Sequence, residues 1–273
     1  MGNTAYHYVY PAAESENDHR FDDLVTLLSE SLQATKPEYG DYVIEPAQQT
    51  MNESRYLLEL KDSRLLNIIW TSTSVEKETT LRPIRIPLRK GLLGYRISFI
   101  ANGTQQKIDR NSQSLDALRT LSIGQGRGWG DVELYRYNDF KVMESQYENL
   151  FKLTAAGRFD LFPRGVNEVF TEYDVRHLEL PALAIEENLL IYYPWPYYFF
   201  TSRTNEYLAA RVEKGLLLMI KSGRFDELFQ ARHGDTIRKG RLTERRVIKI
   251  INPLLPESTP LDDSRLWYDP LAK

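Results

Sequence analysis

The sequence contains no cysteine. This absence excludes disulfide bonds, zinc sites built from thiolates and a cysteine nucleophile. It does not identify the compartment, because periplasmic proteins can also lack cysteine.

A run of apolar residues long enough to cross a bilayer, about 18 residues, is also lacking. The longest apolar stretch is 189–200, and Pro194 and Pro196 interrupt it. The residues that follow Met1 and Gly2 are polar, without the basic start and apolar core of a signal peptide. We therefore expect either a cytoplasmic protein or a mature chain whose signal peptide has been removed.

The composition is that of a globular protein without a general affinity for nucleic acid. Hydrophobic residues make up 42% of the 273 residues and charged residues 27%, far from the composition of disordered chains. The net charge of -3 lacks the basic excess that binding to phosphates requires. Basic residues cluster only near the C-terminus, where we expect a solvated helix face: Arg238, Lys239, Arg241, Arg245 and Arg246.

The sequence shows no catalytic or metal-binding motif. Its four histidines lie far apart, without the i, i+4 pair typical of a metal site. It contains no Gly-x-Ser-x-Gly motif, and no pattern sets two carboxylates apart for acid–base chemistry. We therefore expect a protein that is not an enzyme and that holds no metal and no cofactor.

Apolar patterns alternate between those of strands and those of helices along most of the chain. This alternation predicts an α/β fold, and in its first part a lobe with a largely parallel sheet. The predicted strands are 5–9, 42–45, 65–70, 91–100, 121–123, 159–162, 189–193 and 197–201. The predicted helices are 20–34, 53–61, 145–156, 205–221 and 224–231, and a proline-rich tail at 251–273 is expected to wrap over the surface.

The glycine-rich run 124–130 is a candidate for ligand contact. It lacks the Gly-Lys-Ser/Thr ending of a P-loop and the third glycine of the dinucleotide-binding fingerprint. Such a loop can bind an anion through its backbone N–H groups, or simply turn the chain. Its position at the carboxyl end of a strand favours ligand contact, with Arg127 and Trp129 as the contributing side chains.

Two further features allow two interpretations each. Arg164 follows a predicted strand, and a buried arginine in a cleft binds a carboxylate or phosphate through two hydrogen bonds. The alternative is a surface arginine paired with Glu168 or Glu172. The aromatic run 192–200 suits a core, or else a stacking wall in a cleft.

Several runs, in their order, carry a family resemblance. Residues 70–78 (WTSTSVEKE) form a Ser/Thr-rich turn before a helix start, residues 121–130 form a strand with a Gly-rich loop, and residues 153–160 (LTAAGRFD) end a helix. Together with the runs 86–88, 92–100 and 208–229, they follow one another as in the type II periplasmic binding proteins. The chain therefore resembles that family, in particular the amino-acid-binding (family 3) solute-binding group. The runs 91–96, 157–164 and 252–256 are similar to an uncharacterised subgroup of transporter substrate-binding domains.

Two departures from that family concern the ligand. Family members that bind α-amino acids hold the carboxylate with an arginine after the Glu of the first-lobe motif, where this chain has Glu78 next to Lys77. They hold the amino group with an aspartate, where this chain has Pro163, Arg164 and Gly165. A small polar or anionic ligand, either an anion or an aromatic molecule that forms hydrogen bonds, therefore fits the sequence better than a standard amino acid.

The resemblance implies two lobes joined by two crossings, near 100–104 and 193–197. Lobe I would consist of 1–101 and 196–273, and lobe II of 102–195. Closure of the hinge on a ligand in the cleft would stabilise the closed form.

We expect the ligand to contact side chains from both lobes. Lobe I would contribute Tyr10 and Glu14 from the first loop, Thr71 and Thr73 from the Ser/Thr turn, and Arg96 near the hinge. Lobe II would contribute Arg127, Trp129 and Arg164.

The implied function is that of a periplasmic, monomeric solute-binding protein that works with the membrane permease of an ABC-type transporter. A module that senses a ligand for a signalling protein is the alternative. A cytoplasmic α/β enzyme acting on a small anionic substrate, or a binding protein that has lost its ligand, are further alternatives.

If Arg164 holds the ligand, Arg164→Ala should weaken binding about tenfold or more, which corresponds to about 1.4 kcal/mol. A titration of the variant measures this loss, and an unchanged affinity would remove Arg164 from the site.

Overall fold

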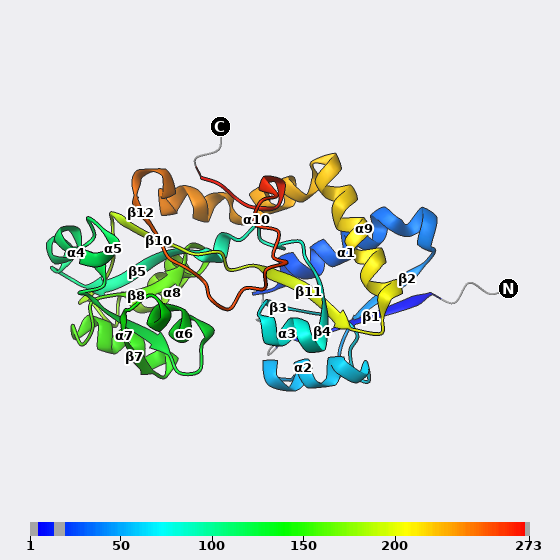
Figure 1. Cartoon of the computed structure of the whole chain (residues 1–273), viewed down its shortest axis with the longest axis horizontal. Coiled ribbons are helices and arrows are strands. Elements are labelled where there is room, and N and C mark those ends of the chain that lie inside the picture. The colour runs from blue at the N-terminus through cyan, green and yellow to red at the C-terminus, as the bar shows by residue number, and fades with distance from the viewer. Residues whose placement is uncertain (1–4, 14–19, 271–273) are drawn as a thin grey trace. The chain divides into compact units, whose positions relative to one another are not determined.

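The computed structural model describes residues 5–13 and 20–270, and these form two compact units (Figure 1). Unit 1 consists of Met1–Lys90, Pro196–Arg232 and Leu255–Trp267. Unit 2 consists of Gly91–Trp195, His233–Leu254 and Tyr268–Lys273. Strands and helices alternate in both units, so the predicted α/β class is confirmed.

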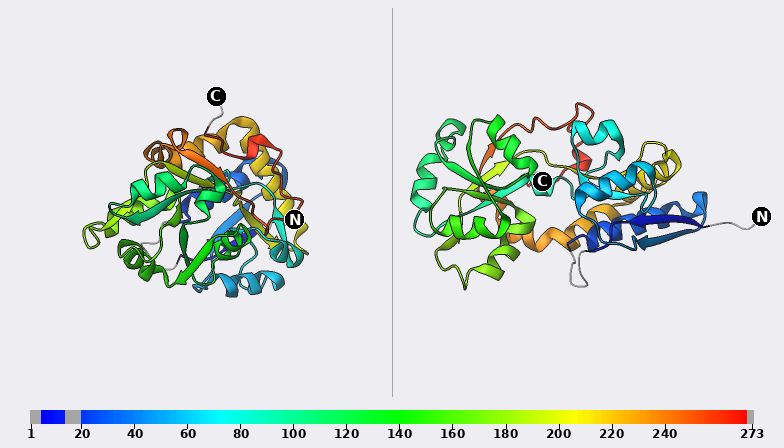
Figure 2. Two further views of the ribbon diagram at one scale, coloured as in Figure 1. Left: turned by 60° about the vertical axis from the view of Figure 1, so that its left-hand side comes forward. Right: turned by 90° about the horizontal axis from the view of Figure 1, so that it is seen from below.

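Unit 1 contains two small sheets. Strands β1 (Tyr6–Tyr10) and β2 (Tyr42–Pro46), blue in the right-hand view of Figure 2, pair in parallel. Strand β11 (Tyr197–Ser202) lies between β3 (Ile69–Ser72) and β4 (Leu81–Ile84) and is antiparallel to both. The predicted largely parallel sheet is therefore wrong for this unit, because its central strand comes from a distant part of the chain and runs in the opposite direction.

The helices of unit 1 are α1 (Asp22–Tyr39), α2 (Glu53–Asp62), α3 (Val75–Thr80) and α9 (Glu206–Ser222). Helix α1 continues five residues beyond its predicted end at 34 and includes Pro37. The fully buried Arg211 of α9 lies at this end and donates a hydrogen bond of 2.7 Å to the carbonyl of Gly40. A cation at a helix C-terminus satisfies carbonyl groups that have no partner within the helix.

Unit 2 has a five-stranded sheet built on β5 (Tyr95–Ala101). Strand β5 pairs antiparallel with β8 (Phe162–Gly165), β9 (Leu183–Ile185) and β10 (Leu189–Tyr192), and β12 (Arg246–Lys249) adds to β10 in parallel. Strands β6 (Ser122–Gly126) and β7 (Lys141–Ser145) form a separate parallel pair. The helices of this unit are α4 (Gln105–Asn111), α5 (Leu115–Leu118), α6 (Gly130–Tyr137), α7 (Tyr147–Ala155) and α8 (Val166–Arg176).

The remaining helix, α10 (Arg224–Gly240), begins in unit 1 and ends in unit 2, and short 3-10 turns lie at Leu92–Gly94, Leu242–Glu244 and Ser264–Leu266. Among the described residues, no helix is both long enough and apolar enough to span a membrane.

The two units differ from the predicted lobes at 91–101, at 233–254 and at the segment that begins with Tyr268, although the boundary between 195 and 196 is the same. Residues 91–101 lie in unit 2, because β5 pairs with three strands of that unit. Residues 233–254 also lie in unit 2, because β12 pairs with β10. The chain therefore passes between the units more often than the two predicted crossings.

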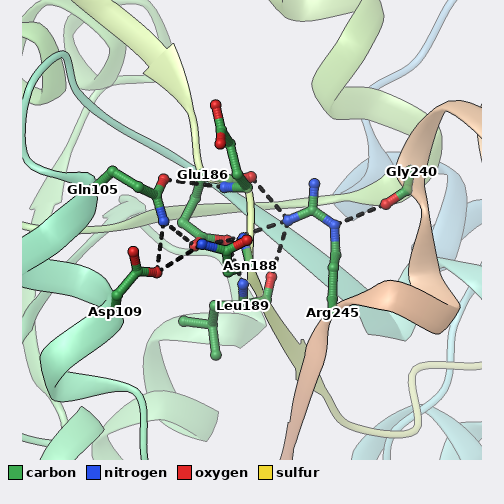
Figure 3. Close-up of polar contacts among 8 residues, drawn as sticks. Gln105, Asp109, Glu186, Asn188, Leu189, Gly240 and Arg245 are labelled. Carbon is green, nitrogen blue, oxygen red and sulfur yellow. Dashed lines mark hydrogen bonds and ion pairs between the residues drawn. The ribbon is translucent and has the colours of Figure 1, made fainter.

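A buried carboxylate fixes the chain after α10 to the sheet of unit 2 (Figure 3). Glu186 is fully buried and accepts hydrogen bonds from Gln105 Nε2 at 2.8 Å and from the backbone N–H of Leu189 at 2.6 Å. Arg245 lies 3.2 Å from the same carboxylate and also donates to the carbonyl of Gly240. Arg245 is thus not on a solvated helix face as predicted, because its charge compensates that of Glu186.

Gly215 permits the close contact between α1 and α9. A Cβ atom placed on Gly215 would lie 2.0 Å from the carbonyl oxygen of Ser31, which belongs to the backbone of α1. Any larger side chain must therefore push the two helices apart.

We expect Gly215→Ala to lower the free energy of unfolding by about 1–3 kcal/mol, the usual cost of overpacking. Urea unfolding followed by circular dichroism measures this change. Ala210→Gly, at an exposed position of the same helix, is the control for helix propensity, which is worth about 1 kcal/mol. A stability of Gly215→Ala equal to or above that of the parent would contradict the close contact.

Candidate functional site

Unit 1 contains a cavity of about 660 Å³. It lies where β1 ends and where α1 and α2 begin, and β11 contributes its first residue. A volume of this size holds a small organic molecule. The side chains used below are Tyr10, Phe21, Glu53, Tyr56, Trp70 and Tyr197.

Three aromatic rings form one wall of this cavity. The ring centroid of Trp70 lies 5.7 Å from that of Tyr10 and 5.7 Å from that of Phe21. Trp70 is itself fixed from behind by the buried Phe199, at 6.4 Å. Because the rings hold one another in place, the wall is a preformed surface for an apolar or aromatic group.

Glu53 supplies the carboxylate of the cavity. Its Oε1 atom accepts a hydrogen bond of 2.6 Å from Thr71 Oγ1 and one of 3.0 Å from Lys77 Nζ. Partial burial favours the neutral acid, but the charge of Lys77 and these two hydrogen bonds prevail and hold the pKa of Glu53 below its usual value. Glu53 is therefore ionised near neutral pH.

The Ser/Thr turn, predicted as a ligand contact, is engaged within the protein. Thr71 and Thr73 are both buried, and Thr73 Oγ1 donates to Glu78 at 2.6 Å. Glu78 also binds Arg85 Nη2 at 2.5 Å. The turn thus orients the carboxylates of Glu53 and Glu78.

Arg164 of unit 2 is buried and paired within its own unit. Its Nε and Nη2 atoms lie 2.8 and 2.7 Å from the two oxygens of Glu172, and Glu168 lies at 3.2 Å. The guanidinium stacks over the ring of Trp129, 4.9 Å from its centroid. Of the two interpretations of Arg164, pairing with these glutamates is the one that the structure shows, although the pair is buried and not on the surface.

Arg96 is held in a similar way. It is buried, lies 2.9 Å from Asp131 and packs over the rings of Tyr193 and Trp195, while Tyr193 donates its hydroxyl to the same aspartate. Arg96 and Arg164, both predicted as ligand contacts, therefore already have carboxylate partners.

The glycine-rich loop packs against its own aromatic residue. A Cβ atom on Gly126 would lie 2.2 Å from the indole of Trp129, so glycine is required there for close packing. Gly128 has φ +78°, a conformation that few other residues adopt. Arg127 is exposed.

The predicted site residues that the structure describes belong partly to unit 1 and partly to unit 2. Tyr10 lines the cavity, while Thr71 contacts Glu53 and Thr73 contacts Glu78. Glu14 lies outside the described residues. Arg96, Arg127, Trp129 and Arg164 belong to unit 2, and their contact with a ligand stays a prediction.

Sequence analysis missed the central role of Glu53 and Trp70. Asn52 accepts a hydrogen bond from the N–H of Arg55, which places Glu53 in the first turn of α2. The sequence Asn-Glu before a helical pattern indicated this cap. The contact between Glu53 and Lys77 could not be predicted, because the two residues are far apart along the chain. Within the described residues, no group of His, Cys, Asp or Glu has an arrangement that could hold a metal ion.

No protein-family model and no curated protein sequence matches the chain. Solved structures match its fold. The probable amino-acid ABC transporter extracellular-binding protein ytmK of Bacillus subtilis is 16% identical, with a TM-score of 0.62 over 85% of this chain and 99% of that one. An ancestral arginine-binding protein bound to glutamine is 16% identical, with a TM-score of 0.55 over 86% and 100%.

A histidine kinase sensor domain with similarity to periplasmic binding proteins is 15% identical, with a TM-score of 0.54 over 85% of this chain and 96% of that one. The chain therefore has the two-lobe α/β fold of these binding proteins, as the sequence predicted. The similar structures are binding and sensor proteins, not enzymes.

We expect Arg164→Ala to lower the free energy of unfolding by about 3 kcal/mol, because the largely buried Glu172 would lose its cationic partner and keep the hydroxyl of Tyr147. Urea unfolding measures this loss. The double variant Arg164→Ala, Glu172→Ala should lose less than the sum of the two single variants. Strict additivity would show that the pair does not stabilise unit 2.

Proposed function

We propose that this chain is an extracytoplasmic solute-binding protein that captures a small polar ligand for an ABC-type transporter. The aromatic cavity of unit 1, with its ionised carboxylate, is the observation that carries the proposal. Hinge closure of the lobes on the ligand would report the bound state to a membrane permease. A periplasmic location and a monomeric state belong to the same proposal.

The fold supports this function by analogy, because ytmK is described as a probable amino-acid ABC transporter extracellular-binding protein. The cavity supports it independently. Mostly apolar walls with a few fixed polar groups are the usual composition of a small-molecule site.

The anionic ligand expected from the sequence loses its main support. That expectation depended largely on Arg164, which stands where the family has an aspartate, and Arg164 is paired with Glu172. The proposal therefore keeps a polar ligand and drops the preference for a negative charge.

A ligand-sensing module is the second candidate. It is favoured by the similarity to a histidine kinase sensor domain, which has the same fold. Genes for a permease and an ATPase next to the gene of this protein would favour transport, whereas a gene for a membrane-anchored kinase would favour sensing.

A thermal-shift screen against amino acids, polyamines, small carboxylates and aromatic metabolites tests the binding function. A ligand at 100 times its Kd stabilises the folded state by about 2.7 kcal/mol and should raise the melting temperature by several degrees. Heat-unfolded protein refolded without ligand serves as the reference for reversibility. A folded protein whose melting temperature responds to none of these compounds would count against solute binding.

A further inference from the structure

We infer that the cavity of unit 1 selects a small organic cation with an apolar or aromatic body. This inference depends on the proposed solute-binding function and adds the chemical class of the ligand. It follows from the carboxylate of Glu53, from the engagement of Lys77 within the protein and from the aromatic wall.

The first observation concerns the hydrogen bonds of Glu53. Thr71 and Lys77 both bind its Oε1 atom, and among the described residues none donates a hydrogen bond to Oε2. The side chain is 50% exposed and lines the cavity, so Oε2 can accept a hydrogen bond from a ligand. An ammonium or guanidinium group is the strongest donor for such an oxygen.

The second observation concerns Lys77, the cation nearest to this carboxylate. Its Nζ atom has three N–H groups, and it donates to Glu53 at 3.0 Å, to Thr71 Oγ1 at 2.8 Å and to the carbonyl of Ser72 at 2.9 Å. All three donors are used within the protein. Lys77 therefore orients Glu53 and is not available to bind an anionic ligand.

The third observation is the character of the walls. Tyr10 lines the cavity and is partly exposed, and a cation over the face of such a ring is attracted by roughly 0.5–2 kcal/mol. Trp70 is 4% exposed and holds the ring of Tyr10 in place. Among the described lining residues, Asp22 and Glu53 are acidic and Arg20 is basic, and Lys77, which is not part of the lining, pairs with Glu53. Arg20 lies 5.5 Å from the centroid of Phe21, so this cation packs on the aromatic wall.

Calorimetric titration with three matched probes tests the inference. Phenethylammonium, 2-phenylethanol and 3-phenylpropanoate share a ring on a short chain and differ in charge. At low ionic strength and pH 7, we expect phenethylammonium to bind about tenfold or more tightly than the alcohol, the effect of one charged hydrogen bond. The anion should bind most weakly.

Two variants locate the charge preference. Glu53→Gln should remove most of the preference for phenethylammonium and leave the affinity for 2-phenylethanol nearly unchanged. Glu59→Gln is the matched control, because it makes the same change on the same helix at a residue that does not line the cavity. Circular dichroism melting of both variants shows that they are folded.

The outcomes separate this inference from the proposed function. If the alcohol or the anion binds as tightly as the cation, or if Glu53→Gln binds all three probes as the parent does, the cation preference is wrong and solute binding stands. If no probe binds, the inference also fails, and the thermal-shift screen alone then decides whether the protein binds a solute.

Discussion

The pairing of β11 with β3 on one side and β4 on the other is the interaction on which unit 1 depends. It places Phe199 opposite Trp70, and the packing of these two rings fixes the indole that forms the wall of the cavity. It also brings Tyr197 to the cavity from a segment more than a hundred residues farther along the chain. The candidate site therefore exists only when this long-range sheet has formed.

The two units use charge differently. In unit 2, three arginines are buried against carboxylates, in the pairs Arg96–Asp131, Arg164–Glu172 and Arg245–Glu186. Because an unpaired buried charge is costly, each pair holds its neighbours in one arrangement. Unit 1 also has such a pair, Arg89–Asp23, but its Glu53 is half-exposed and, among the described residues, meets protein donors through one of its two oxygens. Unit 1 thus presents a charge to a cavity in addition to its buried ion pair.

Local patterns in the sequence predicted much of the fold. The helix expected at 205–221 is α9 at Glu206–Ser222, because its apolar face repeats at helical spacing over four turns. Helix α8 was not predicted, because its apolar pattern is weak. Without this helix, the sequence could not show whether Arg164 pairs with its glutamates on the surface or in the core. Of the site, Tyr10 was predicted from its place after a strand. The contact between Glu53 and Lys77 was beyond prediction, because no local rule brings residues 53 and 77 together.

The order in which segments join each unit has a consequence for folding. Strand β12, which completes the sheet of unit 2, lies at Arg246–Lys249, and unit 1 takes up Leu255–Trp267. During synthesis, neither unit can be completed until almost the whole described chain has left the ribosome. Sheets closed by such distant segments form slowly, because the entropy of closing long loops is lost before their contacts are gained.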